Sequence, residues 1–377
     1  MKKSIALAAI ASSAVLASCG GNDSTSALPA PNTTIAVPPS VQSTEAGYSV
    51  TVFAKAPGTL RPDDLVQLGE SVFAVYQDNN INPDGSLAAG ATSGQAQVVQ
   101  YDLAGNVQHT YNVPGHPDGI VAYDSGTIWV STNEDANAEL IVINVGAGTQ
   151  QTYTDDVAPN QLPHGGGLDD MKLIGGVVYA SASNPTTVAA TTGVTYSTDA
   201  NGTTAQYGVN ANPVVYNLTL NSDGKTFHAS TALVGGIAAS MAGGTTTLNM
   251  TDPDSMAVAP SGDLVVTSQQ DSELVFVSNI GASNQTVSVV PLTLYGNPWP
   301  TDDTRWAPAA SESFMLVSDN KAQLIYRIDS KSGFTAGSAY SAGQGTVLST
   351  DTSTGFMTPL AIGMNSPHGI IFVTAAP

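Results

Sequence analysis

The chain has 377 residues, of which 30 are acidic and 10 are basic, so its formal net charge at pH 7 is −20. A chain this acidic is repelled by phosphate, which excludes nucleic acid as an expected partner and argues against binding to anionic lipid. Hydrophobic residues make up 42% of the chain, enough for a full core, and 37 Gly and 22 Pro favour turns and strands over helices.

The N-terminus, MKKSIALAAIASSAVLASC, has a basic start at Lys2 and Lys3. An apolar stretch over 5–16 follows and is too short for a standard membrane span. It ends in Leu-Ala-Ser-Cys, which resembles the lipobox of bacterial lipoproteins. The resemblance implies that residues 1–18 are removed as a signal peptide and that Cys19 carries the lipid, with palmitate among its acyl chains. The alternative is an ordinary secretory signal with a chance Cys.

The subcellular location that this resemblance implies is the bacterial cell envelope. Gly20, in place of an Asp, favours outer-membrane anchoring, with the protein facing the periplasm or the cell surface. Cys19 is the only Cys in the chain, so the mature domain is expected to contain no disulfide and no Cys-based site. Residues 19–45 are rich in Ser, Thr and Pro and are predicted to be a flexible tether. Residues 46–377 then form the folded domain.

A degenerate repeat follows along the chain. Its clearest copies are HPDGIVAYDSGTIWV (116–130) and DPDSMAVAPSGDLVV (252–266), each a turn, an apolar run, a second turn and a second apolar run. An Asp-Asp variant occurs in RPDDLV (61–66) and GLDDMKLI (167–174). A blurred fifth copy spans 302–333, and the last segment contains SPHGII (366–371). The spacing indicates repeated units of short strands joined by Gly, Asp, Asn and Pro turns.

One unit of this kind cannot bury both of its faces, whereas units packed around an axis can. The sequence therefore predicts an all-β fold, a β-propeller of six blades with seven as the alternative; a β-sandwich or solenoid would need a different regularity. Closure is expected from the N-terminal strand at 48–56, as the outermost strand beside three strands from 345–375. In a competing register, 366–371 is an innermost strand.

The repeats resemble the NHL-like and SMP-30/gluconolactonase-like propellers over most of 48–375. That resemblance implies a Ca²⁺ ion held by Glu, Asn and Asp, one of them the Asp of a Pro-Asp-Gly turn, which makes Asp118 or Asp254 the candidate metal ligand. The family's first-blade Glu has no match unless Asp63 or Asp64 replaces it, and its Asn ligands have no match. The Pro-His-Gly turn is similar to that of streptogramin-lyase-like propellers, in which a His acts in ring opening.

Polar residues at the start of each innermost strand are expected to meet at one end of the channel. Carboxylates that converge there would repel one another unless a cation, such as Ca²⁺, lay among them. The alternative is that each Asp only caps its own turn and each His is an ordinary turn residue. The candidate ligand-binding residues are Asp64, His116, Asp118, His164, Asp169, Asp254 and Asp303, and their neighbours Asp63, Asp170, Asp252, Asp302 and His368 share these turns.

The sequence leaves two functions open, because a fold does not decide an activity. The first is an envelope-anchored propeller that binds a small molecule, a glycan or an envelope protein and reaches the membrane through the lipid on Cys19. The alternative is a Ca²⁺-dependent hydrolase or lactonase with its site in the channel, so whether the protein is an enzyme stays open. The small number of charges also predicts that the fold tolerates acid.

Overall fold

The computed structural model of the chain describes residues 28–157, 162–183, 195–198, 204–207, 210–310 and 312–375. Within these ranges the named elements are all β-strands, and no helix is present that could span a bilayer. Two of these strands, β13 (Thr195–Thr198) and β14 (Thr204–Tyr207), pair only with each other. Cys19 and the predicted signal peptide lie outside the described residues.

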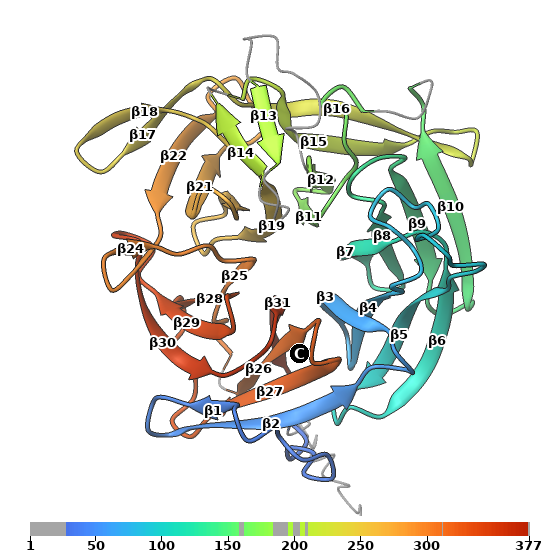
Figure 1. Ribbon diagram of the computed structural model, residues 1–377, viewed down its shortest axis with the longest axis vertical. Helices are drawn as coiled ribbons and strands as arrows, with labels where there is room; N and C mark the ends of the chain where they lie inside the picture. Colours follow the sequence, from blue (N-terminus) through green and yellow to red (C-terminus); the bar gives the residue numbers. More distant parts are fainter. Residues whose placement is uncertain are drawn as a thin grey trace, which may run out of the picture.

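Three units of four antiparallel strands come first, and in each the chain runs from the channel outward (Figure 1). Unit one contains β3 (Arg61–Leu68), β4 (Ser71–Gln77), β5 (Ala96–Asp102) and β6 (Val107–Val113). Unit two contains β7 (Pro117–Asp124), β8 (Thr127–Thr132), β9 (Glu139–Asn144) and β10 (Thr149–Asp155). Unit three contains β11 (Met171–Ile174), β12 (Val177–Ser181), β15 (Pro213–Leu220) and β16 (Thr226–Val234). Units two and three merge into one eight-stranded sheet because their outermost strands, β10 and β16, pair in parallel.

The next two units carry additional strands at their outer edges. Unit four contains β19 (Pro253–Val258), β20 (Leu264–Ser268), β21 (Glu273–Ser278) and β22 (Thr286–Pro291), extended by β17 (Ala238–Met241) and β18 (Gly244–Thr247). Unit five contains β25 (Asp303–Trp306), β28 (Ala339–Gly343), β29 (Thr346–Thr350) and β30 (Phe356–Ile362). Its outer edge is covered by β23 (Thr293–Leu294), β24 (Asn297–Pro298) and β1 (Gln42–Ser43).

Unit six joins the two ends of the described chain. From the channel outward it contains β31 (Pro367–Thr374), β26 (Ser313–Asp319), β27 (Leu324–Ser330) and β2 (Tyr48–Lys55). The N-terminal strand is outermost, as predicted. The expected strand assignment is otherwise wrong: the strands of 302–333 divide between units five and six, the three strands from 345–375 split between the same units, and the competing register holds for β31.

The physical reason for this exchange is that β26 is apolar on both faces. Phe314 and Leu316 pack with unit one, whereas Met315 and Val317 pack with unit five. The two faces of β26 pack against these two units, and the β26–β27 hairpin therefore lies between them in unit six rather than beside β25.

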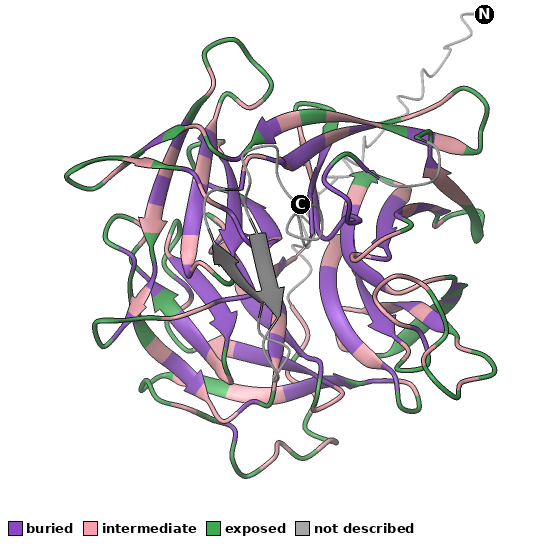
Figure 2. Ribbon diagram, turned by 45° about the horizontal axis from the view of Figure 1, so that its top comes forward, coloured by how far each residue is buried: buried purple, intermediate pink, exposed green. Residues whose placement is uncertain are grey.

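The core consists of apolar layers between neighbouring units. Within the described residues, the buried apolar side chains form six clusters, and each cluster draws its members from two adjacent units, including units six and one. Figure 2 shows these buried residues along the strands and the exposed ones in the outer loops and turns. The continuous ring of sheets and the layers between them confirm an all-β propeller.

The described part of the predicted tether lies against the propeller. Val41 is buried in the layer between units five and six, and β1 pairs with β30. The guanidinium of Arg327 donates a hydrogen bond to the backbone oxygen of Pro29 at 2.8 Å. Residues 28–45 therefore make specific contacts with units five and six.

Candidate functional site

The first residues of the innermost strands line a cavity at one end of the channel, which we call the channel mouth. The cavity measures about 340 Å³. Seven carboxyl groups and three basic side chains are among its lining residues, which are Asp63, Gln77, His116, Asp118, Glu134, Asp169, Asp252, Asp254, Gln269, Asp302, Asn320, Lys321, Ser366 and His368. The mouth is therefore strongly acidic, as the turn sequences predicted.

Each unit contributes one residue to the mouth from the same place at the start of its innermost strand. We call this set the outer ring: Asp63, Asp118, Asp169, Asp254, Asp302 and His368. A proline precedes four of the six, at a strand start where its missing N–H removes no necessary ladder hydrogen bond. The turn motif thus has a structural role, and it places an ionisable side chain at the mouth in every unit.

The following residue in each unit forms a second layer, which we call the inner ring: Asp64, Gly119, Asp170, Ser255, Asp303 and Gly369. Acids alternate with small residues. Each acid accepts a hydrogen bond from a backbone N–H of the next unit, from Ile120 to Asp64 at 3.4 Å, from Met256 to Asp170 at 2.7 Å and from Ile370 to Asp303 at 2.8 Å. The small residues leave room for this contact, since a Cβ at Gly119 would lie 2.5 Å from the backbone of Asp169 and Asp170.

Two basic side chains neutralise the inner ring. Lys172 Nζ lies 2.7 Å from Asp170 and 3.9 Å from Asp64. Arg305 contacts Asp303 and lies 3.7 Å from Asp64 and 3.6 Å from Asp170. Burial works to raise the pKa of Asp170, but Lys172 and Arg305 outweigh it and the pKa is lowered. At Asp64 and Asp303 burial outweighs the same two cations, and the pKa of each is raised. Asp64 and Asp303, expected at the mouth, thus lie one layer deeper and join neighbouring units, while Asp63 and Asp302 take the mouth positions.

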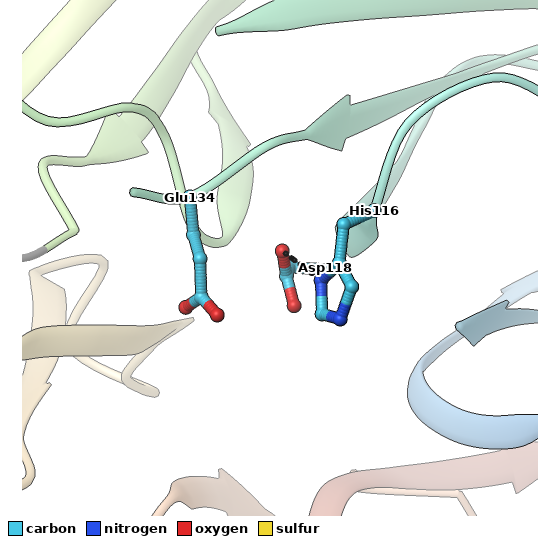
Figure 3. Close-up of side chains that lie close together, drawn as sticks. All are labelled: His116, Asp118 and Glu134. Atoms are coloured by element: carbon cyan, nitrogen blue, oxygen red, sulfur yellow. Dashed lines mark ion pairs between the residues drawn. The ribbon is translucent and has the colours of Figure 1, made fainter. Parts of the chain in front are cut away.

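Within the mouth, His116, Asp118 and Glu134 converge from unit two (Figure 3). One possible ligand atom from each lies within 4.8 Å of the other two. Asp118 is 4% exposed; no N–H group donates to its Oδ2, although its carboxyl group hydrogen-bonds with that of Asp63. The nearest basic atom to this oxygen is His116 Nδ1 at 3.6 Å, which is itself buried and without a hydrogen bond. The group therefore presents a nitrogen that has no hydrogen bond and a carboxylate oxygen that has no N–H donor.

Two amide side chains hold this group in place. Gln77 Nε2 donates to Asp118 Oδ1 at 2.6 Å, which leaves Oδ2 without an N–H donor, and Asn320 in turn donates to Gln77 Oε1 at 3.1 Å. Asn133 accepts a hydrogen bond from the His116 backbone N–H at 2.9 Å and precedes Glu134 in the chain. Its backbone has a positive φ of 68°. Because Asn133 bonds to His116 and directly precedes Glu134, it fixes the relative positions of these two residues.

On the opposite side of the mouth, His368 forms ion pairs with two carboxylates. Its Nδ1 lies 2.9 Å from Asp63 and 3.2 Å from Asp302. Burial disfavours the charged imidazolium, but Asp302 and Asp63 outweigh that effect and raise the pKa of His368 to about 10. His368 is therefore a fixed cation at neutral pH, which partly neutralises its own side of the mouth.

The remaining mouth carboxyls are held against ionisation. Burial, followed by repulsion from neighbouring carboxyls, raises the pKa of Asp118, Glu134, Asp169 and Asp254 well above the usual range. The same causes raise the pKa of Asp252 to about 6, and burial raises that of Asp302 to about 7 despite the opposing charge of His368. A bound divalent cation would reverse this preference, because it favours the ionised carboxylates.

His164 does not reach the mouth. Its ring is completely buried, with Nδ1 2.9 Å from the Tyr216 hydroxyl and Nε2 3.1 Å from the backbone oxygen of Ser183. Burial lowers the pKa of His164 to about 4, so the side chain is a neutral, hydrogen-bonded part of unit three.

Of the residues singled out from the sequence, His116, Asp118, Asp169 and Asp254 meet at the mouth, whereas Asp64, Asp303 and His164 do not line it. Sequence reasoning missed Glu134, Gln77 and Lys321. These residues follow or end the second strand of a unit, and their only signal was a polar tip after an apolar run.

Comparisons with known proteins found similar solved structures but no family. No protein-family model matches the chain, and no curated protein matches it in sequence. Among solved structures, the chain is similar to a candidate gluconolactonase, with 13% identity, a TM-score of 0.46 and coverage of 89% of this chain and 95% of that chain. It is also similar to virginiamycin B lyase from Staphylococcus aureus, with 11% identity, a TM-score of 0.48 and coverage of 87% and 97%. Likenesses at this level carry no argument about activity.

Proposed function

We propose that the protein is a binding module that holds a divalent cation at the channel mouth and takes its ligand through that cation. The observation that carries the proposal is the buried Asp118 carboxyl group, whose Oδ2 receives no N–H donor; it hydrogen-bonds with the carboxyl of Asp63, and five further carboxyl groups share the cavity. An ionised carboxylate buried among other carboxyls is costly, and a bound cation removes that cost for several neighbours at once. Oxygen ligands of this kind fit Ca²⁺, the ion expected from the sequence.

The ligand expected at this site is small or presents a small group to it. A cavity of about 340 Å³ lies at the low end of the range for small-molecule sites. Asn320, Lys321 and Ser366 bring hydrogen-bond donors to the rim opposite the acidic side. An oxygen-rich small molecule, a glycan or a polar side chain of an envelope protein could bind both the cation and these donors.

The test is the metal content of the purified protein, followed by thermal unfolding with a chelator and with added divalent cations. A cation at 100 times its Kd adds about 2.7 kcal/mol to the free energy of unfolding. We therefore expect the melting temperature to rise by several degrees with cation and to fall with chelator. No bound divalent ion and no shift with any of them would remove the basis of the proposal.

A metal-dependent hydrolase or lactonase is the second candidate function. It is favoured by the group drawn in Figure 3, because three protein ligands would leave a fourth position of a bound ion for water. A water molecule at that position could be activated as a nucleophile. Hydrolysis of lactones or esters that is lost with chelator and restored by one metal ion supports this function; binding without turnover supports the first.

We also propose that Cys19 is lipidated and anchors the protein in the bacterial envelope. The support is the order of basic start, apolar stretch and Leu-Ala-Ser-Cys box in the sequence. The test is mass spectrometry of the membrane-extracted protein, together with a Cys19→Ser variant. Lipid on the N-terminal residue of the wild type, and its loss in the variant, are the expected results.

A further inference from the structure

The strongest indication of which cation binds comes from the three side chains of unit two. We propose that His116, Asp118 and Glu134 form a site for a nitrogen-binding first-row transition metal, Zn²⁺ or a similar ion, in preference to Ca²⁺. This inference rests on the proposed function, which it sharpens by naming the ligands and the class of metal.

The three side chains offer ligand atoms of two chemical types, nitrogen and oxygen. Within the described residues, His116, Asp118 and Glu134 are the one group of at least three such side chains whose ligand atoms lie this close together. The set contains an imidazole nitrogen and two carboxylates. Imidazole is a ligand for Zn²⁺ and its first-row neighbours, whereas Ca²⁺ takes six to eight oxygen ligands. Three protein ligands with an open fourth position are also the pattern of functional zinc sites.

Two of the donor atoms, on His116 and Asp118, are buried side by side. His116 Nδ1 has no hydrogen-bond partner and no N–H group donates to Asp118 Oδ2, and at 3.6 Å the two atoms are too far apart to bond to each other. Metal–ligand bonds of about 2.0–2.2 Å at tetrahedral angles place two ligand atoms roughly 3.4 Å apart. The two atoms are thus separated by nearly the distance that one shared ion would impose.

Hydrogen bonds and close packing hold the three side chains in place. Gln77 donates to Asp118 Oδ1 and leaves Oδ2 without an N–H donor, while Asn133 ties the backbone of His116 to the residue before Glu134. A Cβ at Gly115 would lie 2.4 Å from the Asn133 side chain, and a Cβ at Gly167 would lie 1.9 Å from the Asn133 backbone oxygen. Hydrogen bonds and close packing that orient ligands in this way are typical of metal sites.

Unit four has the same backbone at this place and allows a comparison with unit two. The backbone N–H of Asn133 donates to the His116 oxygen at 2.8 Å, and that of Gln269 donates to the Asp252 oxygen at 2.9 Å. By this equivalence, unit four has Asp252, Asp254 and Gln270 in place of His116, Asp118 and Glu134. Gln270 hydrogen-bonds with Asp252, and Gln269 donates to Asp254 at 2.8 Å. Unit four therefore has an amide, Gln270, where unit two has Glu134, a carboxylate whose Oε2 accepts a hydrogen bond from Ser183 Oγ at 3.4 Å.

The experiment is isothermal titration of the metal-free protein with Zn²⁺ and, separately, with Ca²⁺. The variants are His116→Asn and Glu134→Gln, the second of which introduces the amide that unit four has. The matched control is His228→Asn, which removes another histidine that lies beside a carboxylate, 3.0 Å from Asp156, on the surface. Thermal unfolding of each metal-free variant shows whether it is folded, and a Co²⁺ absorption spectrum reports nitrogen coordination independently of affinity.

We expect one equivalent of Zn²⁺ to bind more tightly than Ca²⁺, and each site variant to weaken Zn²⁺ binding by roughly ten-fold or more. The Co²⁺ bands of the wild type should change in His116→Asn, and the control should match the wild type. Ca²⁺ binding that is as tight as Zn²⁺ binding, or Zn²⁺ binding that is unaffected by His116→Asn or lost in His228→Asn, overturns this inference alone. If no divalent ion binds, the proposed function falls with it.

Discussion

The outer and inner rings of the channel are adjacent layers of acidic side chains with opposite electrostatic solutions. In the inner ring, Lys172 and Arg305 lie among the three carboxylates, and the acids bond to backbone N–H groups of the next unit. In the outer ring, His368 is the one basic member, and most of the carboxyls are held protonated by burial and repulsion. Acidity alone therefore does not mark a site: the acids of the inner ring bond to the backbone of the next unit, whereas the acids of the outer ring line a cavity.

The largest loss of stability is expected from removing an acid of the inner ring. An Asp170→Ala variant removes the partner of Lys172, a contact of Arg305 and the acceptor of the Met256 N–H. Removing one member of a buried ion pair costs about 3–5 kcal/mol. Urea denaturation should show a loss of that size, and a loss below about 1 kcal/mol would mean that the inner ring does not hold the units together.

The next largest effect is expected in the pH dependence of stability, which reports on the ionisable side chains of the mouth. The pKa values of Asp252 and Asp302 are raised to about 6 and about 7, so protonated side chains favour the folded state. Their contribution is fully present below the unfolded value near 4 and is lost as the pH rises through 6 and 7. His368, with a pKa raised to about 10, contributes stability that is fully present below about 6.5 and lost as the pH rises through 10.

Metal-free protein should therefore be more stable at pH 4.5 than at pH 8 by several kcal/mol, since one pKa unit corresponds to about 1.4 kcal/mol. Denaturant unfolding at both values is the measurement. A saturating divalent cation should restore most of the difference at pH 8. The lowered pKa of Asp170 acts in the opposite direction and matters only as the pH falls below 4. Higher stability at pH 8 without metal would contradict the account of the outer ring.

A smaller effect is expected from enlarging Gly119, one of the small residues of the inner ring. A Cβ at Gly119 would lie 2.5 Å from the backbone of Asp169 and Asp170, so Gly119→Ala must push units two and three apart. Overpacking of this kind costs about 1–3 kcal/mol. The control is Gly126→Ala in the same unit, where the nearest atom to a new Cβ is 3.9 Å away. Equal unfolding free energies for the two variants would remove the packing argument for the alternation of acids and small residues.

The smallest effect, and the one of opposite sign, is expected from the outer ring. Asp254→Asn replaces a carboxyl group whose ionisation is disfavoured by burial and by like charges with a neutral amide, and the amide oxygen can still accept the hydrogen bond from Gln269. At pH 8 without metal we expect the free energy of unfolding to rise by about 1 kcal/mol, the equivalent of less than one pKa unit. Little change is expected at pH 4.5. Destabilisation at pH 8 would show that Asp254 is a structural acid like those of the inner ring.

Single elements show how much of the fold could be predicted from the sequence. The Pro-Asp turns and alternating runs predicted the strands, the ring and the position of Asp118 at its mouth. They did not predict that the β26–β27 hairpin belongs to unit six, because its pattern fits the second and third strands of any unit. Only the packing of Met315 against unit five and of Phe314 against unit one decides that assignment.

The sequence by itself determined an acidic all-β chain in which every innermost strand starts with an ionisable turn. The tertiary structure alone decided which Asp of each Asp-Asp pair faces the mouth, because neighbouring side chains point in different directions and a shift of one residue exchanges them. It also decided that Glu134 joins His116 and Asp118. Glu134 belongs to the turn after a different strand, and no local pattern encodes a distance across a unit.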